Sequence, residues 1–583
     1  MIKIFKYLNK KQVWQIFLSL ILIVGTVYLD LKIPDYMSKI TMYVQSPGHS
    51  VGDIIGAGKW MLLCALLSLF ATIMTSYLSA VISSSFARDL RSRLFSKVES
   101  FSQKEINEFS TASLITRSTN DITQIQMVVV MGLQIFVKAP IMAIWAVTKI
   151  YNKGFEWTLA TGLALLILII FVAIIMVLVM PKFKMMQTLT DNINRVLREN
   201  LTGLSVIRAY NSESYRENKF DKANEELTKT QLFTSKLMAT LFPTINLTMS
   251  ILTLVIYFIG ANLINQAGLM DRYTLFSDMV VFSSYAMQVI MSFMMMSMIF
   301  IMLPRAEISA SRINEVLDTK LSIMDGEIVE SDDPSPYAII FDKVSFKYTD
   351  SEQYILKDID FKVKRGEKLA IIGSTGSGKS TILNLLMRFY DPTEGKILVD
   401  GVDIRDYKQK VLYEKLGAVL QKSFLFKGDI KSNISFGEND EDFEQIKKAA
   451  DIAQASEFIE KYDDKYDHEI AQLGKNVSGG QKQRLAIARA VYRNPEIYLF
   501  DDSFSALDFK TDRDLRHKLK KTYPDSTTVV VAQRVGSIMD SDQIVVLENG
   551  EMVGVGKHKD LLKTCEVYKE IAHSQLSEEE LNG

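Results

Sequence analysis

The chain has 583 residues, too many for one ordinary domain, and its 67 basic and 68 acidic residues leave a formal net charge of −1. This balance gives no reason to expect nucleic acid as a partner. The two cysteines, Cys64 and Cys565, have neither the spacing of metal ligands nor that of a disulfide framework.

Six apolar runs early in the chain are each long enough to cross a hydrocarbon core of about 30 Å at about 1.5 Å per residue. The stretch before the first run, MIKIFKYLNKKQ, is basic, and no small-residue cleavage site follows that run, which favours a collar on the membrane surface over a secretory signal. We therefore expect a six-span α-helical membrane domain over residues 1–320. The runs lie near Val13–Ile33, Trp60–Ser84, Met127–Ile150, Trp157–Met180, Leu237–Ile264 and Leu275–Leu303.

Basic residues indicate the orientation of these runs. The segments after the second and fourth runs are rich in Arg and Lys, whereas those after the third and fifth, YNKGFE and NQAGLMDR, are short and nearly neutral. By the positive-inside rule, both termini and both long segments are cytoplasmic. Because the long segments contain few Pro or Gly residues, we expect membrane helices to continue into the cytosol and turn around there.

Charged residues inside the apolar runs are Asp30, Lys32, Lys138 and Asp278. Facing lipid at the bilayer centre would cost each of them about 2.5–3.5 kcal/mol, so each is a candidate for lining a polar cavity. The alternative is a position near the membrane surface, which we favour for Asp278.

The last run contains the methionine-rich stretch MQVIMSFMMMSMIFIM, Met287 to Met302. Methionine fills irregular cores and also forms pliable surfaces for varied apolar ligands. A buried helix is the simpler interpretation for any single position, and the stretch as a whole mildly favours broad specificity.

A different kind of sequence follows the sixth run. After the linker at 321–336, which includes ESDDPSPY, strand-like stretches such as KLAIIG and EIYLFDD alternate with helical ones. This alternation predicts a parallel sheet wrapped by helices over residues 337–583.

The stretch GSTGSGKST follows an apolar strand and has the G-x-x-x-x-G-K-[ST] pattern of a phosphate-binding loop. Lys379 can reach the outer phosphates, and Ser380 offers a hydroxyl to Mg²⁺. Asp501, at the end of the acidic strand, is placed to hold the same Mg²⁺. Together these elements predict a nucleotide site. The loop residues expected to bind the nucleotide are Gly373, Ser374, Thr375, Gly376, Ser377, Gly378, Lys379, Ser380 and Thr381.

A second anion-binding arrangement is predicted in NVSGGQKQR, where Ser478, Gly479 and Gly480 stand at the start of a helical stretch. One chain that binds one nucleotide does not need two such sites. The second is therefore expected to serve a nucleotide held by a partner.

With these motifs in this order, the chain resembles the ATP-binding cassette (ABC) family, and the order of its domains is similar to that of an exporter half-transporter of type IV architecture, with a helical subdomain in the cassette. The resemblance implies that Tyr348 stacks on adenine and that Gln421 senses Mg²⁺. It implies that VSGGQ, which ends at Gln481, closes over the partner's ATP, and that Ser505 and Asp508 lie in a loop that crosses between cassettes.

The resemblance also implies that two segments couple the cassettes to the membrane helices. Phe109–Asp121 resembles the first coupling segment of the family, and Leu201–Glu213 resembles the second. Both would press on the cassettes and carry motion to the membrane domain.

Two residues depart from the family's pattern. Asp502 stands where the family has a glutamate that polarises the attacking water, and Gln533 replaces the switch histidine. Misplacing a catalytic base by about 1 Å can cost about 10²-fold in rate. Since the signature is nearly intact, with Val477 for the usual leucine, the chain resembles the half of a heterodimeric exporter that has a degenerate ATP site. A homodimer with slow hydrolysis from Asp502 is the alternative.

The resemblance implies export of an amphiphilic, multidrug-like compound, with ATP and Mg²⁺ bound and hydrolysis mainly at the partner's site. A lipid flippase or a peptide or glutathione exporter is the alternative within transport, and an ATP-gated regulatory or sensory membrane protein is the alternative of another class. The expected partners are a second, non-identical half-transporter, the transported molecule and the lipid bilayer. The expected location is the bacterial plasma membrane, with both termini cytoplasmic.

Overall fold

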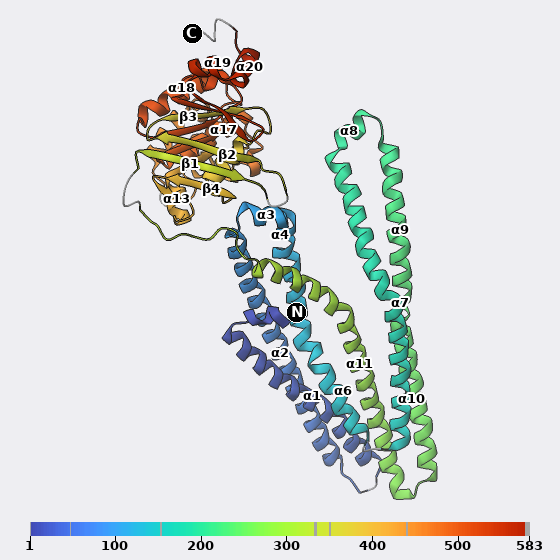
Figure 1. The fold of residues 1–583 in the computed structure, drawn as a ribbon. Helices are drawn as coiled ribbons and strands as arrows, with labels where there is room; N and C mark the ends of the chain where they lie inside the picture. Colours follow the sequence, from blue (N-terminus) through green and yellow to red (C-terminus); the bar gives the residue numbers. More distant parts are fainter. Residues whose placement is uncertain are drawn as a thin grey trace. The chain divides into compact units, whose positions relative to one another are not determined.

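The computed structural model describes residues 2–46, 48–151, 154–330, 335–348, 351–438 and 441–577. The chain forms two compact units (Figure 1). A membrane unit comprises residues 1–98 and 112–319, and a cassette unit comprises residues 99–111 and 320–583. Residues 331–334 of the predicted linker and residues 152–153 of the predicted loop YNKGFE lie outside the described residues, as do the side chains of 297–301 in the methionine-rich stretch.

The described residues of the membrane unit form helices joined by short connections. Among them, six spans are long and apolar enough to cross a membrane, at residues 10–45, 51–99, 111–151, 155–202, 213–266 and 271–296. The six-span prediction is confirmed. The elements are η1 (Ile2–Tyr7), α1 (Lys10–Gln45), α2 (Val51–Glu99), α4 (Thr111–Thr116), η2 (Arg117–Asp121), α5 (Ile122–Met131), η3 (Gly132–Phe136), α6 (Lys138–Tyr151), α7 (Phe155–Thr202), α8 (Leu204–Ala209), α9 (Glu213–Ala239), α10 (Leu241–Gln266) and α11 (Leu269–Asp318).

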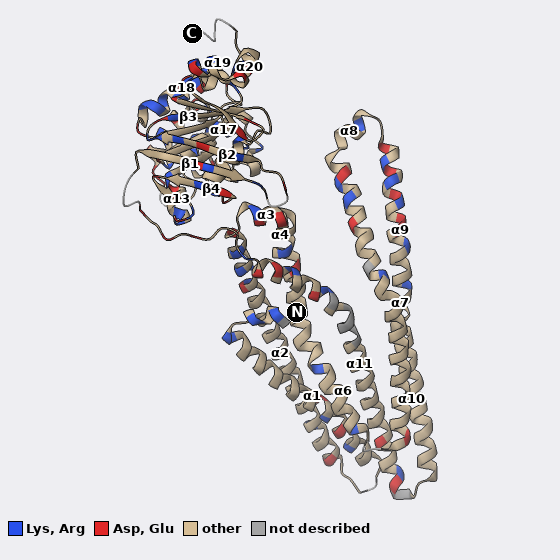
Figure 2. Ribbon diagram, viewed as in Figure 1, with Lys and Arg blue, Asp and Glu red and all other residues tan. Residues whose placement is uncertain are grey.

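Helices α2 and α7 continue well past their apolar runs, as the sequence predicted. The polar end of α7 packs against α9, and the short helix α8 joins them (Figure 1). Glu199 on α7 pairs with Arg216 and Lys219 on α9, at 3.1 and 3.2 Å. Lys, Arg, Asp and Glu gather toward the α8 end of this hairpin (Figure 2), as expected for a part that leaves the apolar phase.

Two of the charged residues inside the apolar runs pair with each other. Lys138 Nζ on α6 lies 3.1 Å from Asp30 Oδ2 on α1. The Ser68 hydroxyl on α2 donates a hydrogen bond to the same carboxylate. The pairing lowers the cost of placing these charges within an apolar helix bundle.

A second polar cluster, which the sequence did not indicate, joins α1, α6 and α11. Lys149 Nζ lies 2.8 Å from Asp35 Oδ2. The fully buried Tyr285 donates its hydroxyl proton to Asp35 Oδ1 over 2.6 Å. The sequence does contain Asp35 and Lys149 near the ends of two apolar runs. That they lie close together depends on helix packing, which the sequence pattern does not show.

The cassette unit contains a six-stranded sheet with the order β12-β11-β3-β10-β9-β6. Neighbouring strands from β11 to β6 are parallel, and β12 is an antiparallel edge strand. Residues rich in Val, Ile and Leu fill the central strands, as expected for a sheet that is buried on both faces. The strands are β3 (Lys368–Gly373), β6 (Leu416–Val419), β9 (Ile497–Asp501), β10 (Thr527–Val531), β11 (Gln543–Glu548) and β12 (Glu551–Gly556).

A second sheet, with the order β2-β1-β4-β5, covers one face of the first, and helices cover the other (Figure 1). Leu499 of β9 belongs to the core shared with the second sheet, and its neighbour Phe500 belongs to the core shared with the helices. This alternation is the period-two pattern of a strand. The remaining elements are α3 (Gln103–Phe109), β1 (Tyr337–Phe346), β2 (Leu356–Lys364), α12 (Lys379–Leu386), β4 (Glu394–Val399), β5 (Val402–Asp403), α13 (Gln409–Lys415), β7 (Gly428–Asp429), α14 (Ile430–Ile434), α15 (Phe443–Ile452), α16 (Ser456–Ile459), η4 (Lys465–Asp467), β8 (Glu469–Ile470), η5 (Gln472–Gly474), α17 (Gly479–Tyr492), α18 (Phe509–Thr522), η6 (Val535–Ser537), α19 (His558–Thr564) and α20 (Glu566–Gln575).

The short helix α3 belongs to the cassette unit although it is distant from it in sequence. Ser102 caps α3 and bonds Glu105 in a capping box. The Ser322 amide donates to Glu105 Oε1 over 3.0 Å, and Asn107 Nδ2 donates to the Tyr390 hydroxyl over 3.2 Å. The chain segment that contacts the cassette is therefore 99–111.

The structure differs here from the first predicted coupling segment, Phe109–Asp121. Most of that stretch lies in the membrane unit, where Arg117 pairs with Glu315 at 2.6 Å and Asp121 accepts a hydrogen bond from Ser309 at 2.9 Å. The resemblance therefore indicated the correct part of the chain, the connection between α2 and α5. It placed the contact with the cassette a few residues too far toward the carboxyl terminus.

Candidate nucleotide site

The motif residues of the cassette gather at one edge of the six-stranded sheet. Gly373 ends β3 and Asp501 ends β9, while Gln421 and Gln533 each follow the end of a strand, β6 and β10, by two residues. These four strands are parallel, so their carboxyl ends meet at the same edge. Such an edge is where open α/β sheets bind ligands.

The loop after β3 has the geometry of a phosphate cradle. Gly376 and Gly378 have φ angles of +85° and +95°, which residues with a Cβ rarely adopt. Lys379 begins α12, and its ammonium donates to the carbonyl oxygens of Gly373 and Ser374 at 2.9 and 2.7 Å. A Cβ at Gly376 would meet nothing within 4 Å, so the loop has open space beside its backbone.

Two further loop residues differ in burial. Thr375 is exposed, whereas Ser377 is buried and its hydroxyl has no hydrogen-bond partner among the described residues. An unpaired buried hydroxyl beside a glycine-rich turn is consistent with a loop that binds an oxyanion.

Ser380 and Asp501 supply the pair of oxygens expected at a magnesium site. Ser380 Oγ donates to Asp501 Oδ1 over 3.0 Å. Burial raises the pKa of Asp501, and the neighbouring Asp502 adds to the rise, while the hydrogen bond from Ser380 opposes it. No cluster of three His, Cys, Asp or Glu occurs among the described residues. These donors fit Mg²⁺, which is commonly held by one or two protein oxygens together with substrate phosphates.

The two divergent residues contact each other. Gln533 Nε2 donates to Asp502 Oδ2 over 2.9 Å. Asp502 has a φ of +48° directly after β9, and its amide donates to the carbonyl of Val531 in β10. Burial raises the pKa of Asp502, and a hydrogen bond from Gln421 is the largest opposing effect. A cavity of about 10 Å³ lies beside Asp502 and Gln533, with room for about one water molecule.

Tyr348 lies in a cluster of aromatic rings beside the loop. Its ring centroid is 4.9 Å from that of Phe346 and 5.2 Å from that of Tyr390, both edge-on. Its hydroxyl lies 3.4 Å from Thr381 Oγ1. The structure therefore brings Tyr348 next to the end of the phosphate-binding loop. The sequence did not indicate Tyr390, which links this cluster to Asn107.

The signature residues form the start of α17. Ser478 caps this helix by accepting from the Gln481 amide, and the Gln481 side chain accepts from the Ser478 amide at 2.8 Å. Ser478 and Gly479 are exposed. A Cβ on Gly480 would lie 3.3 Å from the carbonyl oxygen of Ala506, so the signature adjoins the loop that contains Ser505. The positive end of a 14-residue helix is thus open to a ligand.

The loop after Asp502 connects the site to α18. Ser505 Oγ donates to the carbonyl of Asp502 over 2.8 Å, and Arg534 donates to the carbonyl of Ser505 over 3.3 Å. Asp508 caps α18, and hydrogen bonds from Thr511, the backbone one first, lower the pKa of Asp508. Both predicted loop residues therefore have local structural contacts within this chain.

The fold and the site define a P-loop ATPase cassette joined to a six-span membrane domain. Residues 15–293 match the family described as ABC transporter transmembrane region, and residues 356–505 match the family described as ABC transporter. The chain belongs to the ABC transporter family.

Relatives support this assignment over nearly the whole chain. An uncharacterized ABC transporter ATP-binding protein of Mycobacterium tuberculosis is 35% identical over 549 residues, 93% of each chain. A Bacillus subtilis protein, provisionally named a multidrug export ATP-binding/permease protein, is 30% identical over 83% of this chain and 82% of its own. The solved structure of a bacterial Atm1-family ABC exporter with ATP bound has a TM-score of 0.79 at 25% identity and covers 98% of this chain and 100% of its own. The predicted fold class is confirmed.

Proposed function

We propose that this chain is one half of a heterodimeric ATP-driven exporter in which its own nucleotide site turns over slowly. Its VSGGQ signature would complete the second site, where the partner's ATP is hydrolysed. The observation that carries the proposal is the hydrogen bond between Gln533 and Asp502 at the γ-phosphate end of the site.

In the family's pattern, a glutamate polarises the attacking water and a histidine can carry positive charge. Here the hydrogen-bonded pair of Asp502 and Gln533 stands in their place. A histidine can carry positive charge, which stabilises developing negative charge in phosphoryl transfer, whereas a neutral amide cannot. Asp502 is one methylene shorter than glutamate, and the bond to Gln533 holds its carboxylate close to β10. Both changes act on the same reaction step at the same site.

The signature supports the asymmetry. Ser478 and Gly479 are exposed at the start of α17, and Ser478 retains its cap. The chain therefore keeps the anion-binding element that serves an opposite site while its own base is altered. ATP held by Lys379, with Mg²⁺ near Ser380, Asp501 and Gln421, would act mainly as a clamp.

The proposed substrate is an amphiphilic or apolar small molecule, exported across the bacterial plasma membrane with both termini cytoplasmic. The provisional multidrug name of one relative and the adaptable methionines of α11, such as Met287 and Met291, support this class. Ion pairs inside the membrane unit show that its apolar helices also accommodate polar groups.

The test is steady-state ATP hydrolysis by the purified chain alone and after co-expression with a candidate partner half-transporter that has the glutamate and the histidine. We expect a nearly inactive chain and an active pair. In the pair, replacing the partner's catalytic glutamate should abolish turnover, whereas Asp502→Ala should preserve it.

A matched variant separates this result from simple misassembly. Ser478→Arg should abolish turnover by the pair while ATP binding at Lys379 persists, because Ser478 serves the opposite site. Robust hydrolysis by the lone chain that Asp502→Ala abolishes would instead establish a homodimer with a working aspartate base.

A further inference from the structure

The helix α20 holds the loop that follows β10 at the nucleotide site. Gln575 is the final residue of α20. The Val535 amide donates to Gln575 Oε1 over 2.9 Å, and Gln575 Nε2 donates to the Gln533 carbonyl over 2.8 Å. Neither of these two loop groups bonds to another backbone group among the described residues. The Gln575 side chain therefore supplies the partners that a neighbouring strand would otherwise supply.

Buried contacts fix the position of α20. Tyr568 and Ala572 of this helix are 0% exposed and belong to the same hydrophobic core as Val535. The Tyr568 hydroxyl also lies 2.7 Å from Nδ1 of the buried His558, on α19. Gln575 follows Ala572 by three residues, so it lies on the same side of the helix as this core. Its amide is therefore presented to the loop from a packed helix.

The same loop contacts the catalytic end of the site. The Gln533 side chain donates to Asp502, while the Gln533 carbonyl accepts from Gln575. Arg534 Nη2 donates to the carbonyl of Ser505, in the loop that leads to α18. A shift of the backbone at residues 533–535 would therefore move the partner of Asp502 and a contact of the Ser505 loop together.

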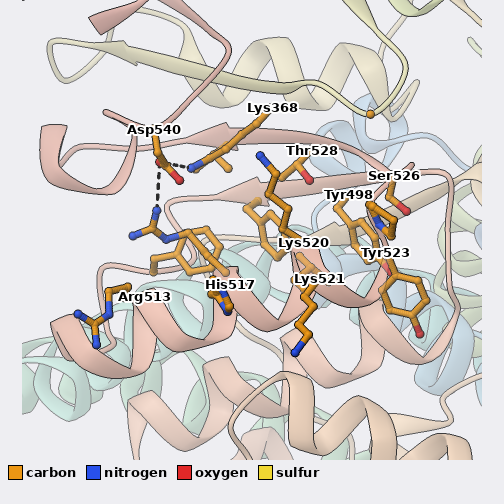
Figure 3. A pocket seen from close by; sticks show the side chains of 17 residues that line it. Lys368, Tyr498, Arg513, His517, Lys520, Lys521, Tyr523, Ser526, Thr528 and Asp540 are labelled. Atoms are coloured by element: carbon orange, nitrogen blue, oxygen red, sulfur yellow. Dashed lines mark hydrogen bonds and ion pairs between the residues drawn. The ribbon is translucent and has the colours of Figure 1, made fainter.

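The far end of this segment is anchored separately. Asp540 pairs with Lys368 of β3 at 2.6 Å and with Arg516 of α18 at 3.3 Å (Figure 3). At the near end, Gln575 is the only side chain among the described residues that bonds the backbone of residues 533–535. Removing the Gln575 amide should therefore loosen the start of the segment while its far end stays in place.

We propose that Gln575 is a positioning residue for the chain's own nucleotide site, and that α20 thereby sets the rate at which ATP bound there is hydrolysed. Gln575 bonds neither Asp502 nor the phosphate-binding loop, so it acts through residues 533–535. A displacement of about 1 Å at a catalytic group can cost about 10²-fold in rate, which makes two bonds to this loop kinetically important. The inference holds whether turnover at the site is slow, as proposed above, or fast.

The first test is hydrogen exchange of the full chain, saturated with a non-hydrolysable ATP analogue and Mg²⁺. Gln575→Met keeps the length of the side chain and removes its amide. We expect the peptide over residues 532–538 to exchange about tenfold faster or more, with the phosphate-binding loop unchanged. The exposed Glu570→Gln, on the same helix, is the matched control and should have no effect. Equal exchange in Gln575→Met and the natural chain would overturn the proposal.

The second test is single-turnover hydrolysis of labelled ATP by an excess of the full chain. Gln575→Met should slow hydrolysis about tenfold or more while the Kd for ATP stays within about twofold, because the loop acts in the reaction step. A general structural fault would instead weaken ATP binding and lower Tm together. Faster exchange of the loop with an unchanged rate of hydrolysis would also refute the proposal.

A graded variant tests the two bonds separately. Gln575→Glu keeps an acceptor for the Val535 amide but loses the donor to the Gln533 carbonyl, so its rate should lie between those of Gln575→Met and the natural chain. The ratio is measured again in the Asp502→Glu/Gln533→His background, which keeps both backbone groups. The absolute rate of the natural chain tests the proposed slow site, whereas the ratio between variant and parent tests Gln575.

Discussion

Gln533 and Asp502 are joined by a 2.9 Å hydrogen bond, so the two residues that depart from the ABC pattern form one unit. The two substitutions are chemically compatible with each other, which would not be expected if each position had lost its function independently. The amide of Gln533 needs an acceptor and the carboxylate of Asp502 accepts it. The pair therefore predicts that single reversions will be less effective than a joint one.

The joint reversion Asp502→Glu/Gln533→His should raise ATP turnover by the lone chain. Lengthening the base and restoring a chargeable imidazole supply the two missing functions, and we expect an increase of about 10²-fold. The chain's own signature is nearly intact, so a homodimer could complete the site. Steady-state phosphate release measures the effect, with Lys379→Ala added to the reverted chain as the control that should return it to background. A double variant no faster than the natural chain would show that these residues do not limit hydrolysis.

Asp501→Asn should stabilise the nucleotide-free protein at neutral pH. Burial raises the pKa of Asp501 above its ordinary 3.8, so ionising this carboxyl opposes folding. The stability from its neutral form is present below the unfolded pKa and is lost as pH rises through the folded pKa. Removing the charge should add roughly 1 kcal/mol, or about 2–4 °C in Tm, and the gain should vanish in acid.

Thermal unfolding of the full chain against pH measures this effect, with the exposed Asp360→Asn as the control. The same Asp501→Asn variant should lose most of the Tm increase that Mg²⁺ and ATP give the natural chain, because Asp501 would no longer hold the metal. A lower Tm for the nucleotide-free variant at neutral pH would contradict the sign derived from burial.

Tyr348→Ala should weaken ATP binding, whereas Tyr348→Phe should preserve it. Stacking of a base on an aromatic ring is worth about 1–3 kcal/mol, which corresponds to a loss of about 5- to 150-fold. The ring, already braced edge-on by Tyr390, provides this surface, while the hydroxyl makes a long contact of 3.4 Å with Thr381. Equilibrium binding of a fluorescent ATP analogue distinguishes the two variants. Equal affinity in the alanine variant would remove adenine stacking as the role of Tyr348.

Asp30 and Lys138 should behave as a coupled pair. Either Asp30→Asn or Lys138→Gln alone leaves one charge without its partner, and the double variant should recover about 0.5–3 kcal/mol of the summed loss. Thermal unfolding in detergent measures the cycle, with Lys59→Gln, outside the pair, as the control. Strictly additive losses would show that the 3.1 Å pair contributes no stability.

The sequence was most informative where chemistry is local. The phosphate-binding loop, the capped signature helix at Ser478 and the end of β9 at Asp501 each depend on a few adjacent residues, and the structure places them at the start of α12, the start of α17 and the end of a buried strand. The six spans followed from apolar length alone.

Contacts between distant segments were not readable in the same way. Tyr390 and Asn107 are separated by 283 residues, and neither belongs to a motif. Asp35 meets Tyr285 only because α1 packs on α11.

The grouping of residues 99–111 with the cassette also bears on how the cassette can be studied in isolation. A soluble fragment beginning at Lys320 would lose Glu105, the acceptor of the Ser322 amide, and Asn107, the donor to Tyr390. The aromatic cluster around Tyr348 would then face water at one end. Nucleotide affinities measured on such a fragment would describe a cassette without residues 99–111. The difference from the full chain would report how strongly the rest of the chain affects ATP binding.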